Sequence, residues 1–380
     1  MSLARAHELR ASCDYRGALA ALHAAMDPAA LVARSRLYED FGDYLSARAD
    51  AERAGDPIRL AGVALAEGAP QEALVLTEGV SCVERGDALA GLARFDEAEE
   101  LYRSLPDDDP LVRLGRGGVL RSRGQYAAAE NELLRALALA EQRFGAWAIE
   151  TAGVLNALGM TYKYWGRFDE GQRVYDQALA ILVRAFGEEH TDVATVHHNL
   201  GGLEHARRDF EAAEPHARKS VELRRRLLGA EHVATAEDEA AWAPILHALG
   251  RDDEAEALLR HAITILTPAL GPDHPEVASA WNNLGSTLAD LDEAAAAYRT
   301  ALAAKERVLG AEHPALAITL NNLAVNARRR GEPGEAEEIY LRALAILEGR
   351  VDPDHPNLAL TRRNLERLRE AGKKNHSSTV

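Results

Sequence analysis

The sequence has little cysteine and no long apolar run. Its 380 residues include two cysteines, Cys13 and Cys82, and neither belongs to a CxxC or CxH pattern. We therefore expect small, buried thiols in a reducing compartment rather than disulfides or metal ligands. No run of 18 apolar residues occurs, which excludes a conventional membrane-spanning helix. The first residues, "MSLARAHELRASCDYRG", lack the apolar core of a signal peptide, so we expect a cytoplasmic protein.

Basic residues are outnumbered by acidic ones. Sixty Asp and Glu face 44 Lys and Arg, which gives a formal net charge of −16. A chain of this charge is not attracted as a whole to nucleic acid or anionic lipid, so we expect neither as a partner. The heavy use of Ala, Arg and Asp indicates a GC-rich bacterial genome.

Motifs of catalytic and cofactor-binding sites are missing as well. The chain has no GxxxxGK[ST], no GxGxxG after a strand, no GxSxG and no HExxH. We therefore predict a protein that is not an enzyme and holds no cofactor.

What the sequence does have is an internal repeat. A GxxH step recurs, and its histidines (His190, His232, His274, His313 and His355) are separated by 42, 42, 39 and 42 residues. The short interval has a local cause. The repeat of His274 has "ADLDE" where its neighbours have "GRFDE" or "GRDDE", and it is three residues shorter at this place. Each period carries two amphipathic helical patterns, and strand signals are absent. Because a helix pair cannot bury its apolar surfaces alone, the repeat predicts an all-α solenoid.

Glycine, acidic residues and proline mark the predicted helix ends. Gly166, Gly250 and Gly331 fall where the first helix of a pair must end, and glycine accepts the left-handed conformation found there. Asp169 and Asp253 place negative charge at the start of the second helix, where it complements the helix dipole. Pro275, Pro314 and Pro356 follow the loop histidine and suit the first position of the next helix. Pro244, inside a predicted first helix, predicts a kink there.

The segments "NNLGSTL", "DEAAAAYRTALAAKERVLGAEHP" and "NNLAVNARRRGEPGEAEEIYLRALAILEG" resemble tetratricopeptide repeats of the 42-residue kinesin-light-chain type found in bacteria. The resemblance is strongest from about residue 110 to 370. It implies an all-α, right-handed superhelical solenoid of about ten helix pairs and a last helix. We expect irregular repeats over 1–108, a regular array over 109–349, a capping helix over 350–372 and a disordered tail over 373–380.

Histidine is the one residue type here that suggests metal. The five GxxH histidines belong to successive loops, roughly 10 Å apart at normal helix spacing, which is too far for shared ligation. We predict instead that each caps the incoming helix. His198 and His205 lie two turns apart on one helix face, but no carboxylate or cysteine accompanies them at ligand spacing, so we expect no metal.

Asparagines recur at one place in the first helix of each pair. The resemblance implies that these asparagines line the concave side and hydrogen-bond the backbone of an extended peptide. An amide side chain offers an acceptor and two donors, which suits it to that role. The alternative is that they cap or cross-link helices within the solenoid. The repeat at 240–241 has two alanines instead. The candidate peptide-binding residues at this place are Asn156, His198, Asn199, Asn282, Asn283, Asn321, Asn322 and Asn364.

Positions one turn from these asparagines share their helix face. They are mainly basic, which predicts a neutral to positive groove in an acidic protein and an acidic or phosphorylated ligand. An unused, solvated surface is the alternative. The basic candidates are Lys163, His205, His247, Arg328 and Arg363.

The sequence thus predicts a scaffold whose groove binds an extended, acidic segment of a partner protein. Two alternatives remain open: a regulator that responds to a short peptide, and an accessory subunit of a separate enzyme such as a protease. The end repeats leave open association with a second copy of the chain.

Overall fold

The computed structural model describes residues 2–12, 14–348 and 356–377. Helices make up 81% of the chain, and these three ranges contain 21 helices and no strand. The prediction of an all-α fold of about ten helix pairs and a last helix is confirmed. The chain divides into two compact units, Met1–Asp209 and Phe210–Val380, called unit 1 and unit 2 below. None of the helices in the described ranges combines the length and apolar character that a bilayer span requires.

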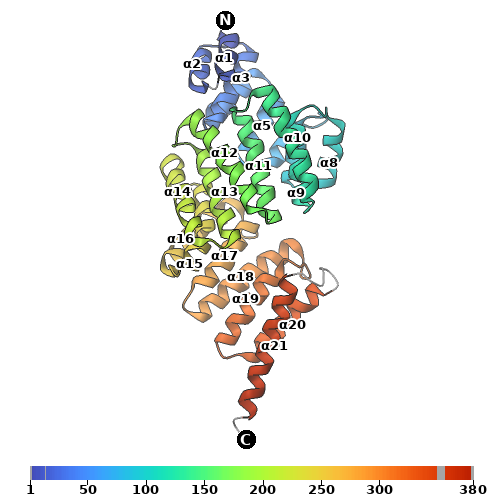
Figure 1. The fold of residues 1–380 in the computed structure, drawn as a ribbon, viewed down its shortest axis with the longest axis vertical. Helices are drawn as coiled ribbons and strands as arrows, with labels where there is room; N and C mark the ends of the chain where they lie inside the picture. The colour runs from blue at the N-terminus through green and yellow to red at the C-terminus, as the bar shows by residue number, and fades with distance from the viewer. Residues whose placement is uncertain (1, 13, 349–355, 378–380) are drawn as a thin grey trace. The chain divides into compact units, whose positions relative to one another are not determined.

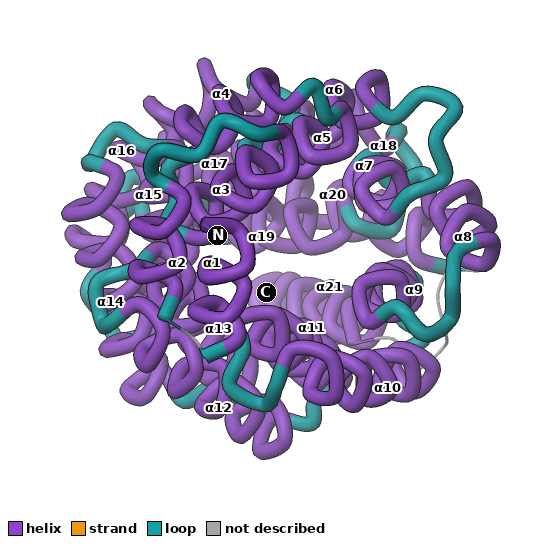
Figure 2. The backbone as a smooth tube through the Cα atoms, turned by 90° about the horizontal axis from the view of Figure 1, so that it is seen from above, coloured by secondary structure: helices purple, strands orange, loops and turns teal. Residues whose placement is uncertain are grey.

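Unit 1 contains the irregular repeats and the first regular ones (Figure 1). Its helices are α1 (Ser2–Ala11), α2 (Tyr15–Leu22), α3 (Pro28–Asp40), α4 (Tyr44–Ala54), α5 (Pro57–Ala66), α6 (Pro70–Leu76), α7 (Val83–Gly91), α8 (Phe95–Ser104), α9 (Pro110–Ser122), α10 (Tyr126–Phe144), α11 (Ile149–Trp165), α12 (Phe168–Phe186) and α13 (Thr191–Arg207). Figure 2 shows α5, α7, α9 and α11 on the inside of this unit, with α6, α8 and α10 outside them. The first helix of each of these pairs therefore lines an inner face.

Unit 2 continues the regular array. Its helices are α14 (Phe210–Leu228), α15 (Val233–Ala248), α16 (Asp252–Leu270), α17 (Pro275–Thr287), α18 (Leu291–Leu309), α19 (Leu316–Arg329), α20 (Pro333–Leu347) and α21 (Pro356–Ser377). One core cluster runs from Ala213 on α14 to Ile346 on α20, so successive pairs bury one another as the solenoid prediction requires.

The loop histidines cap the helices that follow them. The Nδ1 atom of each accepts a hydrogen bond from the backbone N–H two residues later, which supplies a helix-start donor with a partner. The distances for His190, His232, His274 and His313 are 3.2, 3.1, 3.3 and 3.2 Å. The capping prediction is confirmed at His190, His232 and His274, which are the N-caps of α13, α15 and α17. His313 bonds Ala315, the residue before α19, whose N-cap makes no side-chain bond, and His355 lies outside the described residues.

The predicted glycines and prolines are found at or near most of the helix ends. Gly166, Gly250 and Gly331 have φ values of 79°, 73° and 83°, the left-handed region in which a side chain would be strained. Pro275 opens α17 as predicted, whereas α19 begins at Leu316, two residues after Pro314. Pro244 lies within α15, which continues as one helix to Ala248.

A small residue on the first helix admits a tyrosine ring from the second. A Cβ added to Gly159 would lie 2.4 Å from the Tyr175 ring, and one added to Gly285 would lie 2.8 Å from the Tyr298 ring. The first pair is 16 residues apart and the second 13. The three residues missing from the short repeat therefore come out of the connection, and the packing contact is preserved.

The beginning of unit 1 packs against its later helices. Arg10 on α1 forms an ion pair with Glu150 on α11 at 2.7 Å. The Tyr15 and Phe41 rings lie 5.4 and 5.5 Å from the ring of Phe186, at the end of α12. These contacts join segments 140 to 171 residues apart in sequence, so the irregular repeats are an integral part of unit 1.

His190 lies at the same contact. Its ring stacks on Phe186 with centroids 4.0 Å apart, and only 7% of the residue is exposed. Burial lowers the pKa of His190 to about 4, because a charged imidazole would lose its hydration. Burial likewise raises the pKa of Asp40 to about 6, against the opposing effect of Arg10.

The predicted domain boundary at 108/109 does not coincide with the division between the units. One core cluster extends from Ala61 to Val119, and Arg116 Nη2 donates to the Tyr102 carbonyl at 2.7 Å across that point. The change at 108/109 is a change in repeat length within a continuous core. At the other end, α21 runs to Ser377, beyond the predicted end at 372, while 349–355 and 378–380 lie outside the described residues.

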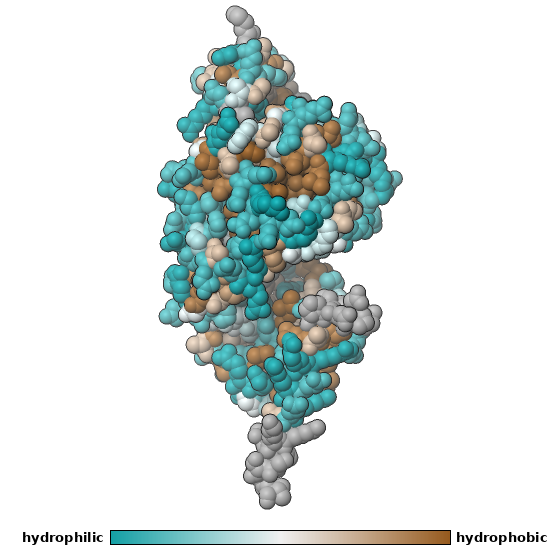
Figure 3. Space-filling model, viewed as in Figure 1, coloured by the Kyte–Doolittle hydropathy of each residue, from teal (hydrophilic) through white to brown (hydrophobic). Residues whose placement is uncertain are grey.

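The face shown in Figure 3 is mostly hydrophilic, with apolar side chains gathered over adjoining parts of α10, α11 and α12. Trp147, in the loop between α10 and α11, is 48% exposed and borders a hollow of about 260 Å³ with Leu155 and Ile181. Arg184 lies over the Trp147 ring, 4.8 Å from its centroid, so a cation partly covers this aromatic side chain.

Candidate functional site

The predicted asparagines contact one another between successive first helices. Asn199 Nδ2 on α13 donates to Asn156 Oδ1 on α11 at 2.8 Å, and Asn322 Nδ2 on α19 donates to Asn282 Oδ1 on α17 at 3.3 Å. In both cases the acceptor is the first residue of its pair and the donor is the second residue of the next pair. These bonds cross-link helices, as the alternative interpretation expects, but a single bond does not exhaust an amide side chain.

The other candidate peptide-binding residues at the asparagine position of the first helices differ in burial. Asn321 is 4% exposed and donates to the Ala317 carbonyl and to Thr361 Oγ1, at 3.0 and 2.6 Å. Asn321 therefore serves the interior of unit 2. Asn283, Asn364 and His198 are half-buried.

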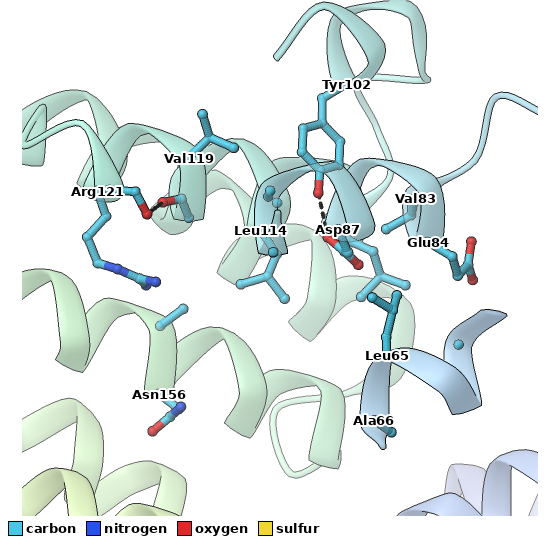
Figure 4. Close-up of a pocket in the computed structure, with 18 of the residues that line it drawn as sticks. Leu65, Ala66, Val83, Glu84, Asp87, Tyr102, Leu114, Val119, Arg121 and Asn156 are labelled. Carbon is cyan, nitrogen blue, oxygen red and sulfur yellow. Dashed lines mark hydrogen bonds between the residues drawn. The ribbon is translucent and has the colours of Figure 1, made fainter. Parts of the chain in front are cut away.

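A cavity of about 710 Å³ lies on the inner face of unit 1. It is formed by α3, α5, α7, α8, α9 and α11, and Asn156 is the predicted residue that lines it. Its apolar lining includes Leu65, Val83, Leu114 and Val119. Figure 4 shows Asn156 on one side of this cavity and Asp87 on another, with Arg121 reaching in from α9.

Three cationic or titratable groups follow one another along the inner face of unit 1. Arg121 on α9, Lys163 on α11 and His205 on α13 are each half-buried and are separated by 42 residues, one full repeat. Burial lowers the pKa of Arg121. Burial also lowers the pKa of Lys163, and the charge of Arg121 lowers it further by a smaller amount. Burial and the charge of Lys163 lower the pKa of His205. The groups therefore repel one another and are partly stripped of water.

Neither Arg121 nor Lys163 has a carboxylate partner among the described residues. Lys163 instead lies over the Tyr164 ring at 4.8 Å, and its Nζ is close to Gly202 on α13. An uncompensated, partly buried cation is costly, and a negative group brought between these two would offset that cost.

Asp87 on α7 is the acidic counterpart in the same cavity. Tyr102 Oη on α8 donates a hydrogen bond to Asp87 Oδ1 (Figure 4). Burial raises the pKa of Asp87 to about 6, although the bond from Tyr102 opposes the shift. Glu84, one turn earlier on α7, also lines the cavity, and Arg59 there is paired with Glu39. The cavity thus has an acidic end at α7 and a basic end at Arg121 on α9, and Lys163 on α11 lies one repeat beyond Arg121.

The basic candidates of unit 2 are more exposed. His247 is exposed and its Nδ1 lies 2.6 Å from Asp252 Oδ1, so a local carboxylate compensates it when it is protonated. Arg328 on α19 and Arg363 on α21 are exposed. In the described part of unit 2, His247, Arg328 and Arg363 are thus exposed, whereas Arg121 and Lys163 of unit 1 are half-buried.

Asp87, Glu84 and Arg121 were not among the predicted residues. Arg121 precedes Lys163 by one repeat, so stepping the repeat back into "GGVLRSRG" would have found it. Asp87 lies in the irregular repeats, where no fixed spacing indicates which residues face inward. The described ranges contain no cluster of three or more His, Cys, Asp or Glu side chains suited to a metal ion.

Comparison with known proteins identifies the repeats. The family profile of tetratricopeptide repeats matches residues 108–182, 150–226, 239–291 and 286–349, which is more than half of the chain. A clustered mitochondria protein homolog of Aspergillus oryzae is 29% identical over 113 residues, 30% of this chain. The chain spans 9% of that relative's length.

Solved structures share the fold. A Rap protein complexed with competence and sporulation factor has a TM-score of 0.56 at 15% identity, over 90% of this chain and 98% of that one. A putative kinesin light chain with TPR-like repeats from Podosopora anserina has a TM-score of 0.45 at 22% identity, over 50% of this chain and 92% of that one. The expectation of tetratricopeptide repeats is confirmed, and arrays of such repeats are scaffolds for protein–protein interaction. The chain belongs to the tetratricopeptide-repeat family.

Proposed function

We propose that the inner face of unit 1 binds an extended, acidic segment of a partner protein. The observation that carries this proposal is the pair Arg121 and Lys163, two partly buried cations one repeat apart that have no carboxylate partner in the part of the chain that the structure describes. The low polarity around them strengthens their attraction for a ligand carboxylate or phosphate compared with the same charges in water.

Asn156 supplies the second component of this site. Its Oδ1 accepts from Asn199, which fixes the orientation of the amide and directs its Nδ2 donors away from that bond. A main-chain carbonyl of an extended ligand is a suitable acceptor for such a donor. The asparagine would then hold the ligand backbone, while Arg121 and Lys163 select its charge.

Binding of defined peptide pools tests the proposal. Three pools of random dodecamers, with acidic, neutral and basic net charge, are incubated with the full chain at low and at physiological salt. We expect preferential retention of the acidic pool, and a smaller preference at high salt because screening weakens attraction between charges. The double variant Arg121→Glu with Lys163→Glu should lose that preference.

A matched variant separates local from overall charge. Arg135 on α10 and Arg173 on α12 are exposed, so Arg135→Glu with Arg173→Glu changes the net charge equally without touching the cavity. This control should retain the acidic pool as the native chain does. Equal losses in both double variants, or preferential retention of the basic pool, would refute the proposed site.

A further inference from the structure

Opposite charges at the two ends of the unit 1 cavity constrain the ligand further. Asp87 and Glu84 line the cavity from α7, whereas Arg121 lines it from α9 and Lys163 follows on α11. In Figure 4, Leu114 lies between Arg121 and Asp87, so an apolar surface separates the two ends. A ligand that fits throughout needs a cation, an apolar middle and an anion, in that order.

The acidic end suits a compact cation. Tyr102 donates to Oδ1 of Asp87, which leaves Oδ2 as the oxygen open to a ligand donor. The apolar neighbours Leu65 and Val83 restrict the space around it. The α-ammonium group of a peptide is small, carries three donors and continues directly into an extended chain, so it meets these limits.

The distance between the ends sets the length of the ligand. Neighbouring packed helices lie roughly 10 Å apart, so Asp87 on α7 and Lys163 on α11 are separated by roughly 20 Å, and Arg121 on α9 stands between them in helix order. An extended chain covers about 3.3–3.6 Å per residue, so about six residues reach from one end to the other.

We infer that this cavity binds the free N-terminal end of a peptide, with its ammonium group at Asp87 and an acidic group about six residues later at Arg121 and Lys163. The inference rests on the proposed function and narrows it to one kind of segment. A short free peptide and the N-terminus of a larger partner share this chemistry. In the first, the anion can be the C-terminal carboxylate; in the second, it is an acidic side chain.

The experiment uses one pool of random hexapeptides in three forms: free at both ends, N-acetylated, and C-amidated. A fourth arm joins the same hexapeptides by their C-termini to an inert carrier protein. Peptides retained by the full chain are quantified by mass spectrometry. We expect N-acetylation to lower retention about tenfold or more, the effect of losing one charge-assisted hydrogen bond.

Three variants assign the effect to the cavity. Asp87→Asn keeps an acceptor for Tyr102, so it should fold, yet it should bind free and acetylated peptides equally weakly. Glu100→Gln removes an exposed carboxylate of α8 away from the cavity and should behave as the native chain. Arg121→Gln should weaken free and acetylated peptides alike, because it acts at the other end.

The outcomes separate this inference from the proposed function. The inference would be overturned if the free and acetylated pools were retained equally, or if the acetylated peptides that are retained owed their binding to a lysine of their own. If retention still depended on Arg121, the proposed acidic-ligand site would stand. If retention depended neither on a free N-terminus nor on Arg121, or if no pool were retained, both the inference and the proposed function would be overturned. A strong effect of C-amidation identifies a short free peptide as the ligand. Undiminished binding of the carrier-linked form identifies the N-terminus of a larger partner. In both cases retention must still depend on the ligand's ammonium group and on Asp87.

Discussion

The contact between Gly159 and Tyr175 offers a direct test of how the repeats pack. Tyr175 on α12 is completely buried, and its ring lies against the backbone of α11 at Gly159. In Gly159→Ala the new Cβ would lie 2.4 Å from Tyr175 Cε1. Carbon atoms pack at about 3.5–4.0 Å, so the ring or the helix must move by about 1 Å.

Two opposing effects set the magnitude. Overpacking a tight core by one methyl group costs about 1–3 kcal/mol, because neighbouring side chains leave their preferred positions. Alanine in a helix is favoured over glycine by about 0.5–1 kcal/mol. We therefore expect Gly159→Ala to lower the free energy of unfolding of unit 1 by about 1–2 kcal/mol. For a unit of this size that corresponds to a Tm lower by about 2–8 °C.

The same helix supplies the control. Gly153 on α11 is exposed, and a Cβ added there would meet no atom within 4 Å. Gly153→Ala should therefore gain the helix preference alone, and its Tm should rise by about 1–4 °C. Calorimetry of the full chain gives the shifts, and hydrogen exchange of α11 and α12 assigns them to unit 1. A Gly159→Ala protein at least as stable as the native chain would refute this account of the packing.

Three titratable groups give further predictions, each checked by urea unfolding at several pH values. His190 has a lowered pKa of about 4, so the unfolded chain takes up its proton first and stability falls as the pH drops below 6.5. Acidification from pH 7.5 to 5.5 should cost about 1 kcal/mol through this residue, and His190→Asn, which keeps a capping acceptor, should lack that loss. Asp87 has a raised pKa of about 6, so its contribution to stability is lost as the pH rises from 3.8 through 6. Relative to the native chain, Asp87→Asn should gain about 2 kcal/mol between pH 4 and 7.5, and equal pH slopes would contradict this. His261 has a raised pKa, chiefly because of its bond to the buried Glu239, so its stabilisation is present below pH 6.5 and disappears at higher pH. His261→Gln should therefore destabilise unit 2 at pH 6 more than at pH 8.5.

Local features of the repeats could be predicted because their causes lie within a few residues. A histidine caps a helix by bonding the N–H two residues later, and Gly166 ends a helix through its own φ angle. Both effects are independent of the rest of the fold. The long repeat period then determines the stacking of pairs, so fold class and helix order followed from the sequence.

The contacts made by the predicted site residues could not be derived in this way. Asn156 and Asn199 were predicted at the right place in their helices, but their mutual bond depends on the angle between successive pairs. Asp87 faces the cavity from an irregular repeat, and the spacing of such repeats does not show which of their residues face inward. The return of α1 and α2 to the end of α12, through Tyr15 and Phe186, depends on how far the array curves over the intervening pairs.

The net charge of the chain is a poor guide to its ligand because most charges are paired internally. Arg123, directly after α9, forms ion pairs with Asp96 and Glu99 on α8, and many other arginines pair in the same way with acidic residues of a neighbouring helix. Arg121, two residues earlier, faces the cavity and has no such partner in the described residues. The charges available to a ligand are the few left uncompensated on the inner face. Arg121, Lys163 and Asp87 are among them in the described part of unit 1, so the ligand's charge pattern follows from such side chains and not from the overall excess of acid.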